Sequence, residues 1–229
     1  MVNINYSSIK QKLSKQLSSS GWDIVDRYIF SNEFHGILEH LVKGVNDNKR
    51  FTPKIKYLFR AFEECPYNKL KAVIVGQDPY PNLNVADGIG FSSSLNNKIP
   101  TSLNTIFNKL EESIDNYERN PDLTRWANQG ILSIQTALTT QVDTIGSHYN
   151  LWKPFIKSII TYINDNNTEI VFVFMGEKAN SFSQYVNIHP TIYCSHPASA
   201  KYKETWKAND VFININNKLK EFNKSEIIW

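Results

Sequence analysis

Cysteine and long apolar runs are both scarce in this sequence. Among its 229 residues only Cys65 and Cys194 are cysteines, and they stand in neither a metal-ligand nor a redox spacing. This usage is typical of a reduced intracellular protein. The longest strongly apolar run, Ile170–Met175, is far too short to cross a membrane, and the polar start carries no secretory signal. We expect a cytoplasmic protein (nuclear in a eukaryote) that is not secreted and has no membrane partner.

Motifs for metals and nucleoside triphosphates are absent as well. No HExxH, CxxC or GxxxxGK[ST] pattern occurs, so neither class of enzyme has support. The formal net charge is only +3 and the pI about 8.7, which is compatible with nucleic acid without indicating it. Hydrophobic residues make up 41% and aromatic residues 13%, enough for a sizeable core. The length favours a single domain over residues 1–229, and we expect a monomer.

Helical and strand patterns alternate along the chain after an N-terminal helical segment, residues 1–50, that is less diagnostic. Thr52 and Pro53 are typical of a helix start, and apolar residues then recur with helical period from Ile55. Further helical stripes are Leu103–Ile114, Phe155–Ile163 and Phe212–Phe222, and runs suited to buried strands are 71–75, 131–135, 170–175 and 191–194. This alternation predicts an α/β fold: three layers, α/β/α, around a short, mainly parallel, four-stranded central sheet.

Polar side chains stand where each predicted strand ends. Asp78 follows the first strand, Gln135 ends the second, Gly176 and Glu177 follow the third, and His196 follows the fourth. Ligands of parallel sheets bind beyond the carboxyl ends of the strands. These groups should therefore converge on one edge of the sheet, although Asp78, in a stretch rich in turn residues, could also simply cap its own backbone.

A carboxylate and a histidine at one edge favour a particular chemistry. Ser195 precedes His196, but there is no G-x-S-x-G turn and no nucleophile–base pair stands out. The pair suits a cationic, sugar-centred transition state with an anionic leaving group, as in glycoside cleavage. Tyr80 and Phe91 offer flat faces for a base, although each, taken alone, is more typical of a core residue.

Several segments in one order carry a resemblance. They are VIVGQDPYP, DGIGFS, PTSLNTIFNKLEESI, WANQGILSIQTALT, VFVFMGEKA, CSHPASA and the terminal IIW. Together, over roughly Thr52 to Trp229, the chain resembles the family 1 uracil-DNA glycosylases. The resemblance implies a DNA repair enzyme that flips deoxyuridine into a tight pocket, hydrolyses its N-glycosidic bond and needs no cofactor. A replication protein and a proteinaceous glycosylase inhibitor are further candidate partners.

The resemblance also implies roles for individual residues. Asp78 matches the aspartate that orients the attacking water and stabilises the oxocarbenium-like sugar. His196 matches the histidine that donates a hydrogen bond to uracil O2 as the base leaves. Gln77 matches a glutamine whose backbone lines the pocket, and Phe91 the aromatic residue that stacks on uracil. Tyr80 matches the residue that blocks the 5-methyl group of thymine.

Contacts with the DNA backbone are implied in the same way, but here the sequence departs from the family. Ser102 matches a serine that contacts a phosphate. Glu177 replaces the serine of a Gly-Ser loop, and Ala200 replaces a leucine that wedges into the base stack. Unstacking a base costs a few kcal/mol, so loss of the wedge predicts a preference for single-stranded over duplex DNA. Tyr202 is the nearest substitute wedge, and Lys201 is a candidate contact for the phosphates.

Three further departures lie in the base pocket and beside it. Pro81 stands where most of the family has histidine, as in the poxviral branch, and Asp87 replaces another histidine. Gln135 replaces the asparagine that reads the uracil edge; it keeps the carboxamide but moves it by roughly 1.5 Å, and a misplacement of about 1 Å can cost a hundredfold in rate. Two alternatives therefore stay open: a glycosylase-like DNA-binding or processivity subunit with weak catalysis, and a glycosylase with altered base choice.

Overall fold

The computed structural model describes residues 4–96, 98–201, 206 and 210–229, of which the side chain of Lys201 is not described. Its α-helices are α1 (Tyr6–Leu17), α2 (Asp23–Ile29), α3 (Asn32–Asn46), α4 (Arg60–Glu64), α5 (Thr101–Ser113), α6 (Thr124–Ala127), α7 (Tyr149–Asn166), α8 (Glu177–Asn180) and α9 (Val211–Glu221). Short 3-10 helices are η1 (Ile55–Tyr57), η2 (Tyr67–Lys69), η3 (Ser183–Tyr185) and η4 (Pro197–Lys201). The strands are β1 (Phe51–Thr52), β2 (Ala72–Gly76), β3 (Ile131–Gln135), β4 (Thr140–Gln141), β5 (Val171–Met175) and β6 (Thr191–Cys194).

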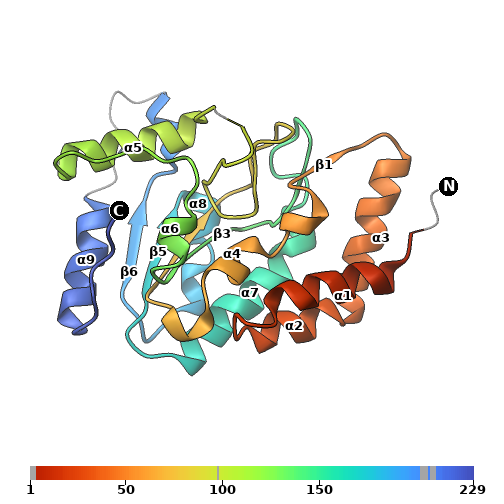
Figure 1. The fold of residues 1–229 in the computed structure, drawn as a ribbon, viewed down its shortest axis with the longest axis horizontal. Coiled ribbons are helices and arrows are strands. Elements are labelled where there is room, and N and C mark those ends of the chain that lie inside the picture. Colours follow the sequence, from red (N-terminus) through yellow and green to blue (C-terminus); the bar gives the residue numbers. More distant parts are fainter. Residues whose placement is uncertain (1–3, 97, 202–205, 207–209) are drawn as a thin grey trace.

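The central sheet has four strands in the order β3-β2-β5-β6, and every neighbouring pair is parallel. Every residue of β2, β3 and β5 is buried, as expected for strands covered on both faces. Figure 1 shows α5 and α9 on one side of the molecule and α1, α2, α3 and α7 on the other, with the strands between them. The predicted α/β fold is therefore confirmed.

Three of the predicted helices are present, each with most of its apolar stripe buried; Ile114 and Phe222, just beyond the ends of α5 and α9, are partly buried. In α5 the buried positions include Leu103, Ile106 and Phe107, and the helix begins directly after Pro100. The isoleucine stripe of α7 is buried in the same core cluster as the strands. The apolar stripe of α9, which includes Phe212, Ile215 and Leu219, is buried there as well. Within the described residues, no helix is long and apolar enough to cross a membrane.

The predicted helix start at Thr52 is wrong. Thr52 belongs to β1, where it pairs with Thr140 of β4 in a separate two-stranded antiparallel sheet. The chain is extended at this point, and helical structure begins only at Ile55 as η1, followed by α4. Strand pairing thus takes the place of the expected first turn, and the apolar spacing from Ile55 onward is divided between two short helices.

Candidate active site

The carboxyl ends of the sheet strands meet at one edge, as predicted. The register aligns Gly76 with Gln135, and Met175 with Cys194. A cavity of about 180 Å³ opens beside these strand ends. It is lined by Gln77, Asp78, Pro79, Tyr80, Pro81, Phe91, Ser102, Gln135, Ile145, His196 and Ala198. The structure therefore brings together seven of the binding and catalytic residues predicted from the sequence, from segments far apart in the chain.

Asp78 is a half-buried carboxylate at the exit of β2. Burial raises its pKa above the usual carboxyl range, while a hydrogen bond from Gln77, the charge of Lys178 and the backbone amide of Gly146 act to lower it. The side-chain amide of Gln77 donates to Oδ2 over 3.1 Å. Oδ1 is buried and has no hydrogen-bond partner among the described residues. One carboxylate oxygen is thus held in place, and the other is left to accept a hydrogen bond from a reacting group.

His196 is held in a defined tautomer by the chain that follows it. The backbone N–H of Ala198 in η4 donates to Nδ1 over 3.2 Å, so in the neutral ring the proton lies on Nε2. Burial lowers the pKa of His196 to about 4, which keeps the ring neutral at physiological pH. Gly176 makes room for this ring, because a Cβ at Gly176 would stand 2.9 Å from that of His196.

Two aromatic side chains form a wall of the cavity. Phe91 is 4% exposed, and its ring centroid lies 5.9 Å from that of His196. The hydroxyl of Tyr80 donates to the backbone carbonyl of Phe91 over 2.8 Å. Burial raises the pKa of Tyr80, so the phenol stays protonated and keeps this bond. The two residues therefore act as one unit, with each fixing the position of the other.

Gln135 presents its carboxamide to the same space. The residue is 8% exposed, and its Oε1 is buried with no hydrogen-bond partner among the described residues. An unpartnered buried acceptor is costly, and a bound group with an N–H would satisfy it. Gln77, which follows β2, is tied to the residue after Gln135, since its carbonyl accepts from the backbone N–H of Thr136 over 3.1 Å.

The predicted DNA contacts are placed less completely. Ser102, the second residue of α5, is 8% exposed and lines the cavity. Ala200 lies in η4 half-buried against the core and is not among the cavity-lining residues. Lys201 ends η4, but its side chain lies outside the described part of the structure, as does Tyr202.

Sequence reasoning missed several residues of the site. Ile145 lines the cavity although its side chain is 64% exposed, and an isolated apolar residue in a polar loop was the only available signal. Lys178 lies beside Gly146, where a Cβ would stand 2.9 Å from its Nζ. Among the described residues, no group of three or more His, Cys, Asp or Glu side chains could hold a metal ion.

The geometry indicates the class of protein. A carboxylate and a neutral imidazole face one cavity that offers an aromatic wall and a carboxamide, as required for enzymes that hydrolyse N-glycosyl bonds. The family model described as Uracil DNA glycosylase superfamily matches residues 62–220. This range includes all of the cavity-lining residues.

Similar proteins narrow the class further. The uracil-DNA glycosylase of Mycoplasmopsis pulmonis is 36% identical over 204 residues, which cover 87% of this chain and 90% of that protein. That of Aliarcobacter butzleri is 33% identical over 201 residues, with coverages of 86% and 94%. Among solved structures, mimivirus uracil-DNA glycosylase gives a TM-score of 0.82 at 26% identity, over 99% of this chain and 89% of that one.

The chain belongs to the uracil-DNA glycosylase family. It is a hydrolase of N-glycosyl bonds that excises uracil from DNA in base excision repair.

Proposed function

We propose that Asp78 and His196 share the catalytic work of uracil excision. The bond between the sugar C1′ and uracil N1 breaks, and its electron pair leaves with the base. The sugar becomes cationic and the base anionic, so charge of both signs develops within the cavity. Oδ1 of Asp78, which has no hydrogen-bond partner within the described part of the chain, faces the sugar and the attacking water. The water oxygen bonds to C1′ and its proton passes to the carboxylate.

His196 stabilises the departing base as a neutral donor. The single observation that carries this role is the hydrogen bond from the Ala198 N–H to Nδ1, which leaves the Nε2–H as the free donor. Because the pKa of His196 is about 4, the ring donates a hydrogen bond to uracil O2 without transferring a proton at neutral pH. Pre-oriented donors of this kind typically contribute about a hundredfold or more in rate.

The remaining cavity residues select the base. Phe91 stacks on the uracil ring, and Tyr80, fixed through its hydroxyl, occupies the space that a 5-methyl group would need. Gln77 lines the pocket with its backbone. The unpartnered Oε1 of Gln135 accepts from uracil N3–H while its amide donates to O4. Release from a panel of modified pyrimidines tests whether this longer side chain alters base choice, and release of uracil alone would support the proposal.

Residues at the rim of the cavity and beyond it contact the DNA strand. Ser102 binds a phosphate next to the flipped nucleotide, and Lys201 and Tyr202 approach the strand beyond η4. Ala200 is too small to fill the gap that a flipped base leaves, so single-stranded DNA is the preferred substrate. Ile145, apolar and exposed where it lines the cavity, supplies a contact for a neighbouring base.

The catalytic roles are tested by uracil release from single-stranded DNA. Asp78→Asn and His196→Ala should each reduce the rate by about a hundredfold or more, since each removes one electrostatic stabiliser. Both should melt within a few degrees of the wild type because neither side chain belongs to the buried core. A wild-type rate in either variant would refute the role of that residue.

Matched controls use the same substitutions outside the cavity. Asp143→Asn changes an exposed carboxylate in the nearby loop, and His35→Ala changes a partly exposed histidine of α3 paired with Glu39 at 3.6 Å. Both should retain the wild-type rate.

A proteinaceous inhibitor is a further proposed partner. Mimivirus UNG Y322L, solved in complex with UGI, gives a TM-score of 0.85 at 28% identity, over 97% of this chain and 92% of that one. We expect UGI to block uracil release by this chain, which a titration of the release assay with UGI would test. Undiminished release at excess UGI would rule the partner out.

A further inference from the structure

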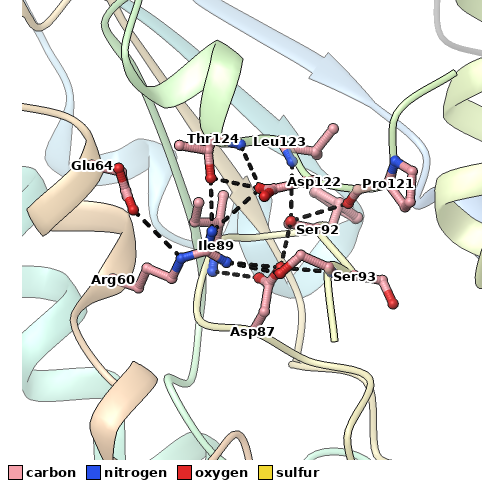
Figure 2. Close-up of polar contacts among 12 residues, drawn as sticks. Arg60, Glu64, Asp87, Ile89, Ser92, Ser93, Pro121, Asp122, Leu123 and Thr124 are labelled. Atoms are coloured by element: carbon pink, nitrogen blue, oxygen red, sulfur yellow. Dashed lines mark hydrogen bonds and ion pairs between the residues drawn. The ribbon is translucent and has the colours of Figure 1, made fainter. Parts of the chain in front are cut away.

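The loop of residues 86–94 winds around one buried carboxylate. Asp87 is 0% exposed, and its side chain accepts three hydrogen bonds from its own loop (Figure 2). The backbone N–H of Ile89 donates to Oδ1 over 3.2 Å, while the Ser92 hydroxyl and the Ser94 N–H donate to Oδ2 over 2.7 and 2.9 Å. Donors two, five and seven residues downstream thus converge on a single side chain, which sets the curvature of the loop.

Arg60 compensates the charge of that carboxylate and ties it to the rest of the protein. Its Nη1 lies 2.9 Å from Oδ2 of Asp87, and its side chain is only 14% exposed. Its Nη2 donates to the Thr124 hydroxyl over 2.7 Å and to Asp122 over 3.3 Å, and its Nε lies 3.7 Å from Glu64 (Figure 2). The guanidinium therefore joins α4 and the start of α6 to the loop.

Phe91 lies inside this arc and depends on it. Its φ of +65° is in the left-handed region, which a bulky side chain adopts only when its surroundings impose it. The preceding Gly90 is held against β3, where its N–H donates to the Ser133 carbonyl over 2.8 Å. The carbonyl of Phe91 is the acceptor for the Tyr80 hydroxyl. A shift of the loop would therefore move the ring of Phe91. It would also move the carbonyl that holds Tyr80, the residue proposed to exclude the 5-methyl group of thymine.

We infer that Arg60 and Asp87 form a positioning pair that holds Phe91 and Tyr80 in place for uracil. The inference rests on the proposed roles of those two aromatic residues. Asp87 stands where the resemblance places a histidine, and Arg60 supplies the matching cation, so this chain uses an enclosed ion pair at this point. Neither residue of the pair lines the cavity, and both act on the base only through the loop.

Loss of the charge at Asp87 should shift the loop of residues 86–94 and thereby disturb the base pocket. In Asp87→Asn one carboxylate oxygen becomes an NH₂ group, a donor that would face the N–H and hydroxyl donors now bound by the carboxylate. Removal of one partner from a buried pair also leaves the other charge uncompensated. Arg60→Met likewise leaves a buried charge uncompensated, in this case that of Asp87.

Inhibition by free uracil measures the base pocket directly, independently of DNA contacts. We expect Asp87→Asn and Arg60→Met each to raise the uracil inhibition constant about tenfold. The inhibition constant of the double variant should not exceed the larger of the two single-variant values. Thymine release from DNA should become detectable. All assays are run well below the melting temperature of each variant. Arg119→Met is the matched control, since Arg119 pairs with Glu111 and two asparagines away from the loop, and it should bind uracil as the wild type does.

The Phe91→Ala background separates positioning from a general loss of stability. If the pair acts through Phe91, Asp87→Asn should weaken uracil binding little further in Phe91→Ala. The inference would be overturned if Asp87→Asn still raised the uracil inhibition constant tenfold in the Phe91→Ala background. It would also be overturned if Asp87→Asn lowered the melting temperature but left uracil binding unchanged. Wild-type uracil binding by Phe91→Ala itself would refute the stacking role as well, so the two failures are distinguishable.

A milder variant keeps the test available if Asp87→Asn does not fold. Thr124→Val removes a second anchor of Arg60 but leaves the Arg60 and Asp87 charges paired. It should raise the uracil inhibition constant by a smaller factor, about two- to threefold. Unchanged uracil binding in Thr124→Val and in Arg60→Met would contradict the positioning role.

Discussion

Gly76 lies directly opposite Gln135 in the sheet, and a Cβ at Gly76 would overlap Oε1 of the Gln135 side chain. The same Cβ would stand 2.6 Å from Cζ of Phe91. The absence of a side chain at the last residue of β2 therefore creates the space in which the carboxamide and the aromatic wall approach each other. The proposed base recognition therefore depends on a glycine that is not itself among the cavity-lining residues.

Gly76→Ala should reduce uracil release by more than tenfold. The added methyl group must displace the tips of Gln135 and Phe91, and displacement of a recognition group by about 1 Å can cost a hundredfold. Single-turnover release from single-stranded DNA measures the effect.

Gly36→Ala is the control for this change. Gly36 is an exposed position of α3 with nothing within 4 Å of its Cβ position. It should retain the wild-type rate and gain about 0.5–1 kcal/mol in stability from helix propensity. An unaltered rate in Gly76→Ala would mean that the two side chains can retreat without loss of function.

The pH profile of kcat/KM should have a single acid limb. The role proposed for Asp78 requires its ionised form, and because burial raises the pKa of Asp78, the limb should lie above the ordinary carboxyl range. The pKa of His196 is about 4, so no inflection should occur near the ordinary histidine value of about 6.5. An inflection there that disappears in His196→Ala would contradict the neutral-donor role.

Lys178→Met should move this acid limb to higher pH. The charge of Lys178 lowers the pKa of Asp78, so its removal raises that pKa and a higher pH is needed for ionisation. Lys153→Met provides the control, since Lys153 lies over the same Tyr149 ring as Lys178 but is not among the groups that shift Asp78. Equal shifts in both variants would point to a general surface-charge effect instead.

Tyr80→Ala should release thymine from DNA as well as uracil. Removal of the ring opens the space for a 5-methyl group, whereas Tyr80→Phe removes only the hydrogen bond to the Phe91 carbonyl. Tyr80→Phe should therefore still exclude thymine largely, with a modest loss of uracil release. A Tyr80→Ala variant that is active on uracil but never releases thymine would show that another group excludes the methyl.

Matched single- and double-stranded substrates test the substitution at Ala200. The wild type should act faster on single strands, and Ala200→Leu should speed duplex cleavage selectively because it restores an apolar plug. Tyr202→Ala tests the substitute wedge proposed from the sequence.

Ile145→Ser tests the exposed apolar residue that the structure adds to the rim of the cavity. It should weaken binding of single-stranded DNA and leave inhibition by free uracil unchanged. Equal wild-type rates on both substrates, with no loss in Tyr202→Ala or Ile145→Ser, would overturn the argument about the wedge.

The sequence by itself determined the layers and the edge at which the site lies. Runs such as 131–135 are apolar throughout because a strand covered on both faces has no polar side, and stripes such as that of α5 follow the helical period. These signals are local, since they depend on residues two to four positions apart. Once the strands are parallel, Asp78 and His196 must meet at one edge, and the resemblance supplied their chemistry.

Only the tertiary structure decided how the site is held. Thr52 read as a helix start because nothing nearby shows that it pairs with Thr140. In the same way, the space left by Gly76 is filled by the side chains of Gln135 and Phe91, which belong to other segments. The charge of the buried Asp87 is compensated by Arg60, which lies on a separate helix. Such contacts join residues distant in the chain, and no local pattern encodes them, because their energies arise only when the packed core brings the segments together.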